Sequence, residues 1–377
     1  MKIAIVSRVV FLSGVSTHIY DLCAGLVDRG HEVFLLTVGP QYPQMEENVE
    51  LFNKILNLGV TYIKVDFPVN SRRKILYLKK MFNSFFELKN IFKREKFDVI
   101  HVHTPSVSFI PALAGLKYVK TRHIANQKIF PFDLKATHEI AVSQDVYNEY
   151  KNRFHYDETQ ISLIHNGVDI SFSNKETLYV VDGVRQRLNI PKDKIVIGLV
   201  GTITYRKGHD ILLKAIDSLE KSLREKILLL FLGSGDREGM EYFNESLSMN
   251  NIKSNEYIQI NFQKNPKAYY NIIDVFVLPS RREAFPLAVI EAMLSGCLVV
   301  RSDTEGANEQ IKNGKTGFLF KSEESKQLAE ILSKVVMNFS DYHKIIDNGR
   351  NFALQHFTSD RMVDKTIEVY KKVLNNE

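Results

Sequence analysis

The sequence contains few cysteines and no long hydrophobic run. Only Cys23 and Cys297 occur among 377 residues, and they lie far apart in the chain. This spacing excludes a disulfide framework and a clustered cysteine metal site, and it fits a reducing compartment. No stretch approaches the roughly 20 consecutive apolar residues that a membrane span requires. The apolar start at 2–6 is interrupted by Arg8 and no signal-peptide cleavage site follows, so we expect a cytoplasmic protein.

Acidic residues are scarce in one segment, residues 71–96. That segment has nine Lys or Arg and two Glu, a net charge of +7, whereas the whole chain carries +6. The rest of the protein is therefore close to neutral, and the basicity calls for a local explanation. A helical wheel separates the segment into two sides. The basic side holds Arg72, Arg73, Lys79, Lys80, Glu87 and Arg94, and the apolar side holds Ile75, Leu78, Met81, Phe82, Phe85 and Leu88.

Two interpretations of this helix remain open. Its apolar side could pack on the core while its basic side is solvated. Alternatively, the basic side rests on anionic lipid headgroups, where each basic residue near the surface contributes about 1 kcal/mol. The second interpretation predicts peripheral contact of 71–96 with the inner face of the cytoplasmic membrane. Nucleic acid binding is not expected, because the basic residues are confined to one helix and no motif that reads nucleic acid accompanies them.

Short aliphatic runs alternate with helical stretches along the chain, which predicts an α/β architecture. Near-continuous apolar runs are typical of strands buried on both faces, and their alternation with helices indicates parallel βαβ units. Two such series follow one another, so we predict two Rossmann-like, doubly wound parallel-sheet domains. The predicted strands are 3–6, 33–38, 99–102, 140–142 and 161–164, then 195–200, 227–232, 275–278 and 298–300.

The domain boundary is expected between Asp169 and Asp193. Asn166-Gly167 is a turn signal, and a polar stretch follows it. We therefore assign residues 1–170 to a first domain, 171–355 to a second, and 356–377 to a terminal helix that packs back on the first domain. Ligands of open α/β sheets bind at the carboxyl ends of the strands. We expect a cleft where the carboxyl ends of the two sheets face each other.

Residues 279–293 carry two glutamates eight positions apart. Glu283 closes the loop after the predicted strand 275–278, and Glu291 lies in the helix that follows. A carboxylate in an apolar setting needs hydrogen-bond donors, and a ribose diol offers two. The helix start at 284–287 presents the positive end of its dipole to a phosphate. The spacing alone also fits an ordinary helix with one capping and one salt-bridged glutamate.

Two glycine loops follow predicted strands. The loop 201–208, Gly-Thr-Ile-Thr-Tyr-Arg-Lys-Gly, places Arg206 and Lys207 at a helix start, which suits a pyrophosphate or, more simply, a solvated basic loop. Gly14 follows the first strand. A residue without Cβ lets the backbone approach a ligand there, or it completes an ordinary turn.

A histidine ends the predicted strand 99–102. His103 can point into the cleft, whereas His101 should sit deeper on the same strand face. His123 is a second cleft candidate. No cluster of His, Cys and Asp has metal-ligand spacing, so neither a metal nor a cofactor is expected. The Gly233-Ser-Gly235 turn does not extend to G-x-G-x-x-G, because its next glycine comes one residue too late.

Together these motifs resemble the retaining glycosyltransferases of family 4, which have the GT-B fold. The family signature is Glu, seven residues, Glu after a strand that ends in Pro-Ser, as in 279–291. Segments 14–18, 29–33, 101–105, 166–169, 207–208 and 316–319 also match in the family's order, so the resemblance covers nearly the whole chain. Two positions depart from it. The family often has a glycine pair where this chain has Ser13-Gly14, and an arginine where it has Thr202.

The resemblance implies metal-independent transfer of a sugar from a nucleotide diphosphate, with retention of configuration by front-side attack. Glu291 would hold the ribose. Lys207 would neutralise the diphosphate, either alone or with Arg206 in place of the arginine missing at Thr202. The implied catalytic residues are His103 and Glu283. The implied donor-binding residues are Gly14, Gly201, Arg206, Lys207, Ala284, Phe285, Pro286, Leu287 and Glu291.

We expect a nucleotide-sugar donor, with UDP-sugars first, and a glycan or lipid-linked acceptor in the assembly of bacterial-type surface polysaccharide or glycolipid. Two alternatives remain open. One is a nucleotide-sugar 2-epimerase of the same architecture, which should lack the glutamate pair beside Lys207-Gly208. The other is a non-catalytic partner subunit, which the threonine at position 202 makes conceivable.

Overall fold

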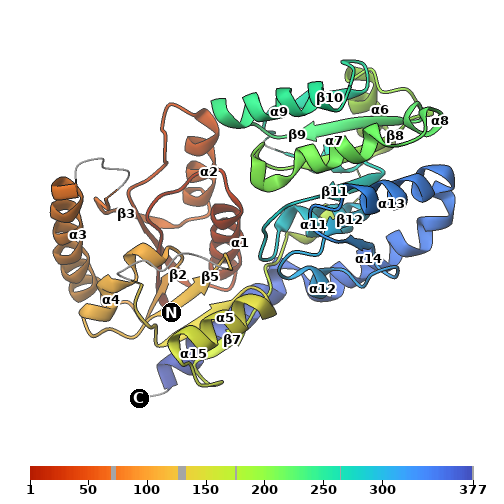
Figure 1. The fold of residues 1–377 in the computed structure, drawn as a ribbon. Coiled ribbons are helices and arrows are strands. Elements are labelled where there is room, and N and C mark those ends of the chain that lie inside the picture. Colours follow the sequence, from red (N-terminus) through yellow and green to blue (C-terminus); the bar gives the residue numbers. More distant parts are fainter. Residues whose placement is uncertain (69–73, 126–132, 175, 264, 376–377) are drawn as a thin grey trace. The chain divides into compact units, whose positions relative to one another are not determined.

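The chain forms two units, each built on its own parallel sheet. In this computed structural model residues 1–68, 74–125, 133–174, 176–263 and 265–375 are described. Unit 1 consists of Met1–Gly167 with Ser359–Glu377, and unit 2 of Val168–Thr358 (Figure 1). The prediction of two doubly wound parallel-sheet domains is confirmed. Among the described residues, no helix is both long enough and apolar enough to cross a bilayer.

Unit 1 contains a seven-stranded sheet in the order β3-β2-β1-β4-β5-β6-β7, with every described strand pair parallel. Its strands are β1 (Lys2–Val6), β2 (Glu32–Thr37), β3 (Thr61–Lys64), β4 (Val99–Val102), β5 (Val119–Arg122), β6 (His138–Ala141) and β7 (Ile161–Leu163). Its helices are α1 (Gly14–Asp28), α2 (Glu46–Leu56), α3 (Lys74–Glu95), α4 (Phe109–Leu113), α5 (Gln144–Phe154) and α15 (Ser359–Asn375).

Two apolar clusters cover the two faces of this sheet, because alternate residues of a buried strand point to opposite faces. Ile3 and Ile5 of β1 belong to the cluster that includes α1, α2 and α15. Ala4 and Val6 belong to the cluster that includes α3 and α4. The sheet is therefore covered on both faces, as continuous apolar runs predict.

The C-terminal helix α15 packs on α1 within unit 1. A Cβ on Gly25 of α1 would lie 2.6 Å from a methyl group of Val363 of α15, so the small residue permits the close approach. At the edge of the contact, Arg29 forms ion pairs with Asp360 at 3.1 Å and with Asp364 at 2.8 Å. The chain thus returns to unit 1 through a buried helix contact.

Unit 2 contains a six-stranded sheet in the order β10-β9-β8-β11-β12-β13, again with every described pair parallel. Its strands are β8 (Ile195–Val200), β9 (Ile227–Leu232), β10 (Tyr257–Ile260), β11 (Val275–Leu278), β12 (Leu298–Ser302) and β13 (Phe318–Phe320). Its helices are α6 (Leu178–Arg187), α7 (His209–Asp217), α8 (Lys221–Arg224), α9 (Arg237–Met249), α10 (Lys267–Tyr270), α11 (Leu287–Ser295), α12 (Ala307–Gln310), α13 (Ser325–Met337) and α14 (His343–His356).

Helix α3 exposes part of the side that we expected to be buried. It packs Leu88, Ile91 and Phe92 into the core, but 54% of Leu78 and 64% of Phe82 are exposed. The apolar residues of α3 cover more of the helix surface than the sheet can bury. Those at one edge of the apolar side, including Leu78 and Phe82, are therefore exposed. Of the basic residues counted above, Arg72 and Arg73 lie outside the described residues. The side chains of residues 74–76 are likewise not described.

Candidate active site

The strand order of each sheet reverses at one point, and the predicted site residues lie at those points. In unit 1, β1 is flanked by β2 and β4, so the loops after β1 and β4 leave the sheet in opposite directions. In unit 2, β8 is flanked by β9 and β11 in the same way. A crevice at the carboxyl ends of the strands is expected at such a switch point. Gly14 and His103 follow the first pair of strands, and Lys207 and Glu283 follow the second.

In unit 2, two cations converge on Glu283. Its Oε1 accepts hydrogen bonds from Lys207 Nζ at 2.7 Å, from Arg206 at 3.0 Å and from the Ser280 hydroxyl at 2.9 Å. Burial alone would raise the pKa of Glu283, but the charges of Lys207 and Arg206 outweigh burial and lower the pKa to about 2. The carboxylate is therefore ionised throughout the physiological range. The loops after β8 and β11 bring together residues 76 and 77 positions apart in sequence.

Glycines set the distance between these loops. Gly208 adopts φ +72°, and a Cβ there would lie 2.0 Å from the carbonyl oxygen of Pro279 at the end of β11. Only glycine is compatible with both the left-handed backbone and this approach. The same loops are tied by the Arg281 amide, which donates to the Arg206 carbonyl at 2.8 Å, and by an ion pair between Arg281 and Asp210. The backbone thus fixes Lys207 beside Glu283.

Glu291 lies on α11 and accepts a hydrogen bond from the Tyr270 hydroxyl at 2.6 Å. Burial raises the pKa of Glu291, while this hydrogen bond and the charge of Lys207 offset part of the rise. Tyr270 was not among the predicted site residues. It is the last residue of α10, and nothing in the local sequence links it to Glu291. A buried tyrosine hydroxyl usually has a hydrogen-bond partner, and here that partner is the buried carboxylate.

The residues at the start of α11 are buried, and contacts from α12 and β12 hold them in place. Ala284, Phe285, Pro286 and Leu287 are all buried, and Pro286 occupies the N-cap. Pro286 has no amide hydrogen, so it cannot bind an anion through the backbone as the predicted group 284–287 implied. Its carbonyl instead accepts from Gln310, which the buried Arg301 also contacts. The positive end of the α11 dipole therefore lies in a rigid setting close to Glu283 and Lys207.

Gly201, in the loop after β8, lies close to the side chain of Lys207. Gly201 adopts φ +150°, and a Cβ there would lie 3.5 Å from the Lys207 side chain. In unit 1, Gly14 begins α1, and the Ser13 hydroxyl caps that helix by accepting from the Ser16 amide. A Cβ on Gly14 would meet nothing within 4 Å, so sterics in the described structure do not require glycine at this position.

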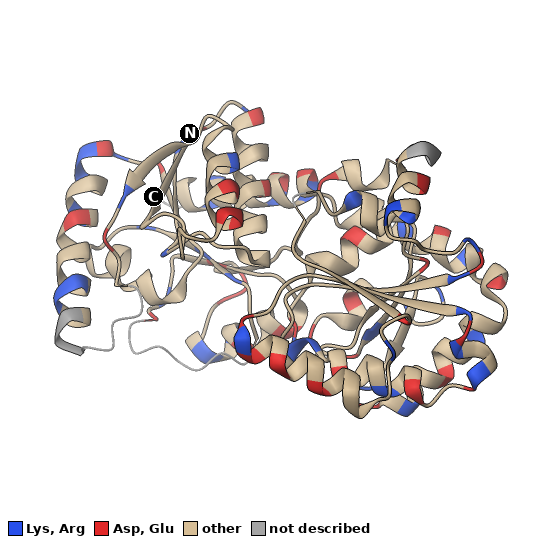
Figure 2. Ribbon diagram, turned by 90° about the horizontal axis from the view of Figure 1, so that it is seen from above, with Lys and Arg blue, Asp and Glu red and all other residues tan. Residues whose placement is uncertain are grey.

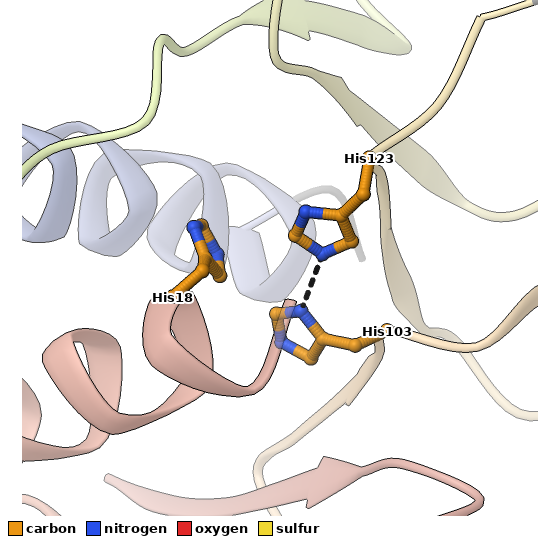
Figure 3. Close-up of side chains that lie close together, drawn as sticks. All are labelled: His18, His103 and His123. Atoms are coloured by element: carbon orange, nitrogen blue, oxygen red, sulfur yellow. Dashed lines mark hydrogen bonds between the residues drawn. The ribbon is translucent and has the colours of Figure 1, made fainter. Parts of the chain in front are cut away.

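His103 lies in a group of histidines in unit 1. Its Nδ1 is 3.1 Å from His123 Nε2, and the rings of both lie near His18 of α1 (Figure 3). Burial lowers the pKa of His18 to about 4 and that of His103 and His123 well below the usual value. These rings are therefore neutral near pH 7. His101 lies deeper, as expected, bonded to the Tyr370 hydroxyl and to Thr121, each at 2.7 Å.

Comparison with known families gives two matches that follow one another along the chain. Residues 12–172 match the model described as Glycosyltransferase Family 4, and residues 181–352 match Glycosyl transferases group 1. The chain belongs to glycosyltransferase family 4. This family 4 glycosyltransferase has the GT-B fold, and the fold expectation is thereby confirmed.

Relatives of this family 4 glycosyltransferase span its full length. An uncharacterized glycosyltransferase of Methanocaldococcus jannaschii is 27% identical, with 98% of each chain covered. The N,N'-diacetylbacillosaminyl-diphospho-undecaprenol alpha-1,3-N-acetylgalactosaminyltransferase of Campylobacter jejuni is 24% identical, covering 98% of this chain and 100% of its own. Among solved structures, Anabaena HepE in complex with UDP superimposes with a TM-score of 0.82 at 17% identity, covering 98% of this chain and 100% of its own.

Proposed function

We propose that this glycosyltransferase transfers a sugar from a UDP-sugar to a lipid-linked or glycan acceptor, with retention of anomeric configuration and without a metal ion. The observation that carries this proposal is the convergence of Lys207 and Arg206 on Glu283 beside the start of α11. Two cations against one ionised carboxylate leave a net positive charge at a helix N-terminus. A diphosphate supplies the missing negative charge.

Each predicted site residue has a role in this proposal. Lys207, joined by Arg206, stabilises the charge that builds on the diphosphate as the sugar departs. Arg206 is half exposed, with 50% of its side chain accessible, so it can turn towards a ligand without leaving a buried charge unpaired. Glu291, held by Tyr270, accepts from the ribose hydroxyls. Glu283 and the α11 start hold the donor sugar. His103 and the Gly14 loop, both of unit 1, are the residues that we propose act on the transferred sugar.

The leaving diphosphate would also act on the acceptor. In front-side attack the acceptor hydroxyl approaches the face from which the diphosphate departs. A phosphate oxygen takes the hydroxyl proton while the new glycosidic bond forms and the old one breaks. Water competes as an acceptor, so exclusion of water favours transfer over hydrolysis.

The known relatives support the choice of substrates. HepE is described with UDP, and the Campylobacter enzyme is named for an undecaprenol-diphosphate-linked sugar. A polyprenol-linked acceptor remains at the bilayer, so an enzyme that uses one must work at the membrane surface. We therefore assign surface polysaccharide or glycolipid assembly as the setting.

Helix α3 offers a surface suited to a bilayer. Leu78, Phe82 and Phe86 form an exposed apolar strip at i, i+4 and i+8, and the rings of Phe82 and Phe86 contact each other. Three lysines of the same helix are exposed: Lys79, Lys89 and Lys93. Figure 2 shows basic positions in blue along α3, the helix at its left. An amphipathic helix with aromatic and basic residues binds at the interface of anionic membranes. We propose that this strip carries peripheral contact with the membrane.

Changing Leu78, Phe82 and Phe86 together to Ser should weaken sedimentation with anionic liposomes by about 100-fold or more. The reason is the loss of apolar area that would enter the headgroup region, at about 25 cal/mol per Å². Changing Met249 and Met337 to Ser removes exposed apolar residues from unit 2 and should leave sedimentation unchanged. Binding by the unaltered protein that is absent, or that does not fall as salt rises, would contradict the proposal.

A thermal-shift screen of UDP-, GDP- and ADP-sugars tests the proposed donor. A ligand that binds only the native state at 100 times its Kd stabilises that state by about 2.7 kcal/mol, so the true donor raises the unfolding midpoint. We expect UDP-sugars to raise it, and Glu291→Gln and Lys207→Met to abolish the rise. A rise with GDP- or ADP-sugars alone would overturn the assignment of the base.

A further inference from the structure

Two buried histidines of unit 1 and one half-buried histidine point into one small space. His18 comes from α1, His103 follows β4 and His123 follows β5 (Figure 3). One nitrogen of each ring lies within 4.8 Å of a nitrogen of the other two. In the part of the chain that the structure describes, no other group of three His, Cys, Asp or Glu has this geometry. The cluster could not be predicted from ligand spacing, because its residues are 85 and 20 positions apart.

Two nitrogen atoms of this cluster have no hydrogen-bond partner. They are His18 Nδ1 and His103 Nε2, both buried, and this statement covers the described residues. His18 is 4% exposed and His103 is 3% exposed. Buried polar atoms are almost always hydrogen-bonded, so two orphans in one cluster call for an explanation. Neutral imidazole offers one lone pair to a metal, and it is the commonest metal ligand in proteins.

The neighbouring His101, in contrast, has a hydrogen-bond partner for each ring nitrogen. Both of its nitrogens are taken, one by the Tyr370 hydroxyl and the other by Thr121. It therefore cannot be a fourth ligand, although its ring centroid lies only 4.1 Å from that of His103. Three imidazoles leave the fourth position of a tetrahedral site open to water.

We propose that His18, His103 and His123 bind one divalent transition-metal ion, Zn²⁺ foremost, and that its binding inhibits sugar transfer. Imidazole nitrogen suits Zn²⁺ and Cu²⁺, whereas Mg²⁺, Ca²⁺ and Mn²⁺ prefer oxygen. The inhibition rests on the proposed role of His103, because a coordinated His103 is no longer available to the sugar. The binding itself does not rest on that role.

Small side-chain movements complete the site. With Zn–N bonds of about 2.0–2.1 Å, the three nitrogens of a tetrahedral site lie about 3.3 Å apart. The longest separation must therefore shorten by roughly 1.5 Å, within reach of rotations about χ1 and χ2. His103 Nδ1 and His123 Nε2 now share a hydrogen bond. In the tautomer in which His103 donates it, the unpartnered His103 Nε2 and His123 Nε2 each carry a lone pair. Both can therefore bind the metal once this hydrogen bond opens, and no proton is released.

Metal binding is tested on full-length protein without an affinity tag, after removal of metals with a chelator. Titration with Co²⁺ should give one equivalent of a visible tetrahedral absorption band, which Zn²⁺ displaces. His18→Asn and His123→Asn should each weaken Co²⁺ binding by at least 30-fold, whereas the exposed control His155→Asn should not change it. Absence of a stoichiometric band, or equal loss in His155→Asn, overturns the site. If the buried variants fail to fold, the unaltered protein decides: Zn²⁺ but not Mg²⁺ must raise its unfolding midpoint.

Inhibition is tested separately. Zn²⁺ at saturating concentration should lower transfer at least 10-fold, a chelator should restore it, and Mg²⁺ should have no effect. His18→Asn should keep transfer activity and lose most of the Zn²⁺ sensitivity. If the metal binds but does not inhibit transfer, the proposed inhibition and the proposed role of His103 are both wrong. The metal site itself is not contradicted by that result. An enzyme that binds metal but transfers no sugar overturns the proposed function alone.

Discussion

Replacing Lys207 by Met should lower kcat/KM for sugar transfer by about 10³-fold. The methionine keeps most of the length of the side chain but removes the charge that we propose faces the departing diphosphate. Loss of one such contact typically reduces the rate about 10²- to 10³-fold. Glu283 keeps Arg206 at 3.0 Å and Ser280 at 2.9 Å, so its carboxylate is not left unpaired and the fold should persist. Initial rates over a range of donor concentrations measure the effect.

Lys214→Met is the matched control. Lys214 lies on α7 close in sequence to Lys207, but its side chain is exposed. Its replacement should change kcat/KM less than two-fold. Arg206→Gln should lower kcat/KM by about 10-fold, an effect between those of the other two variants, because Arg206 is half exposed. If Lys207→Met keeps more than a tenth of the activity, Lys207 does not stabilise the diphosphate.

Gly208→Ala should reduce the free energy of unfolding of unit 2 by about 3 kcal/mol or more. The new Cβ would sit 2.0 Å from the Pro279 carbonyl oxygen at a residue with φ +72°. Left-handed backbone and a backbone clash are each unfavourable for alanine, and here they coincide. Activity should also fall sharply, since the loop positions Lys207. Urea unfolding followed by circular dichroism gives the free energy.

Gly183→Ala provides the comparison within the same unit. Gly183 lies in α6, and a Cβ there would meet nothing within 4 Å. Alanine in a helix interior is favoured over glycine by roughly 0.5–1 kcal/mol, so this variant should be as stable as the original or more so. A Gly208→Ala protein that unfolds at the original urea concentration would show that the loops after β8 and β11 can separate.

The architecture could be predicted because most strands are continuous apolar runs. β5 was missed because its residues Val119–Arg122 include Lys120 and Arg122. Both are buried, and Asp133 and Glu139 neutralise them with ion pairs that come from the next part of the chain. A search for apolar runs cannot detect a strand whose charged side chains are buried and form ion pairs with residues elsewhere in the sequence. The short strands β3, β10 and β13 were missed as well. Polar residues interrupt two of them, since β3 contains Thr61 and Lys64 and β10 contains Gln259.

The individual site residues followed from motifs, but their partners did not. Lys207 and Glu283 stand in recognisable loops after strands and Glu291 in the helix that follows, so sequence alone selected them for testing. Tyr270 of α10 contacts Glu291 and His18 of α1 lies beside His103, and only the folded chain shows these contacts. The switch-point rule could have pointed to His18, because the first helix after β1 begins beside the end of β4.

We expect rapid departure of the sugar from the nucleotide diphosphate to require an acceptor. Phosphorus NMR of the enzyme with a UDP-sugar, before and after a polyprenol-diphosphate-linked sugar is added, tests it directly. We expect no change at first beyond slow hydrolysis, and then UDP in amounts equal to the glycosylated acceptor, whose new bond keeps the donor's anomeric configuration. A new nucleotide sugar formed without acceptor would identify an epimerase. Unchanged spectra with every nucleotide sugar and acceptor would contradict the account.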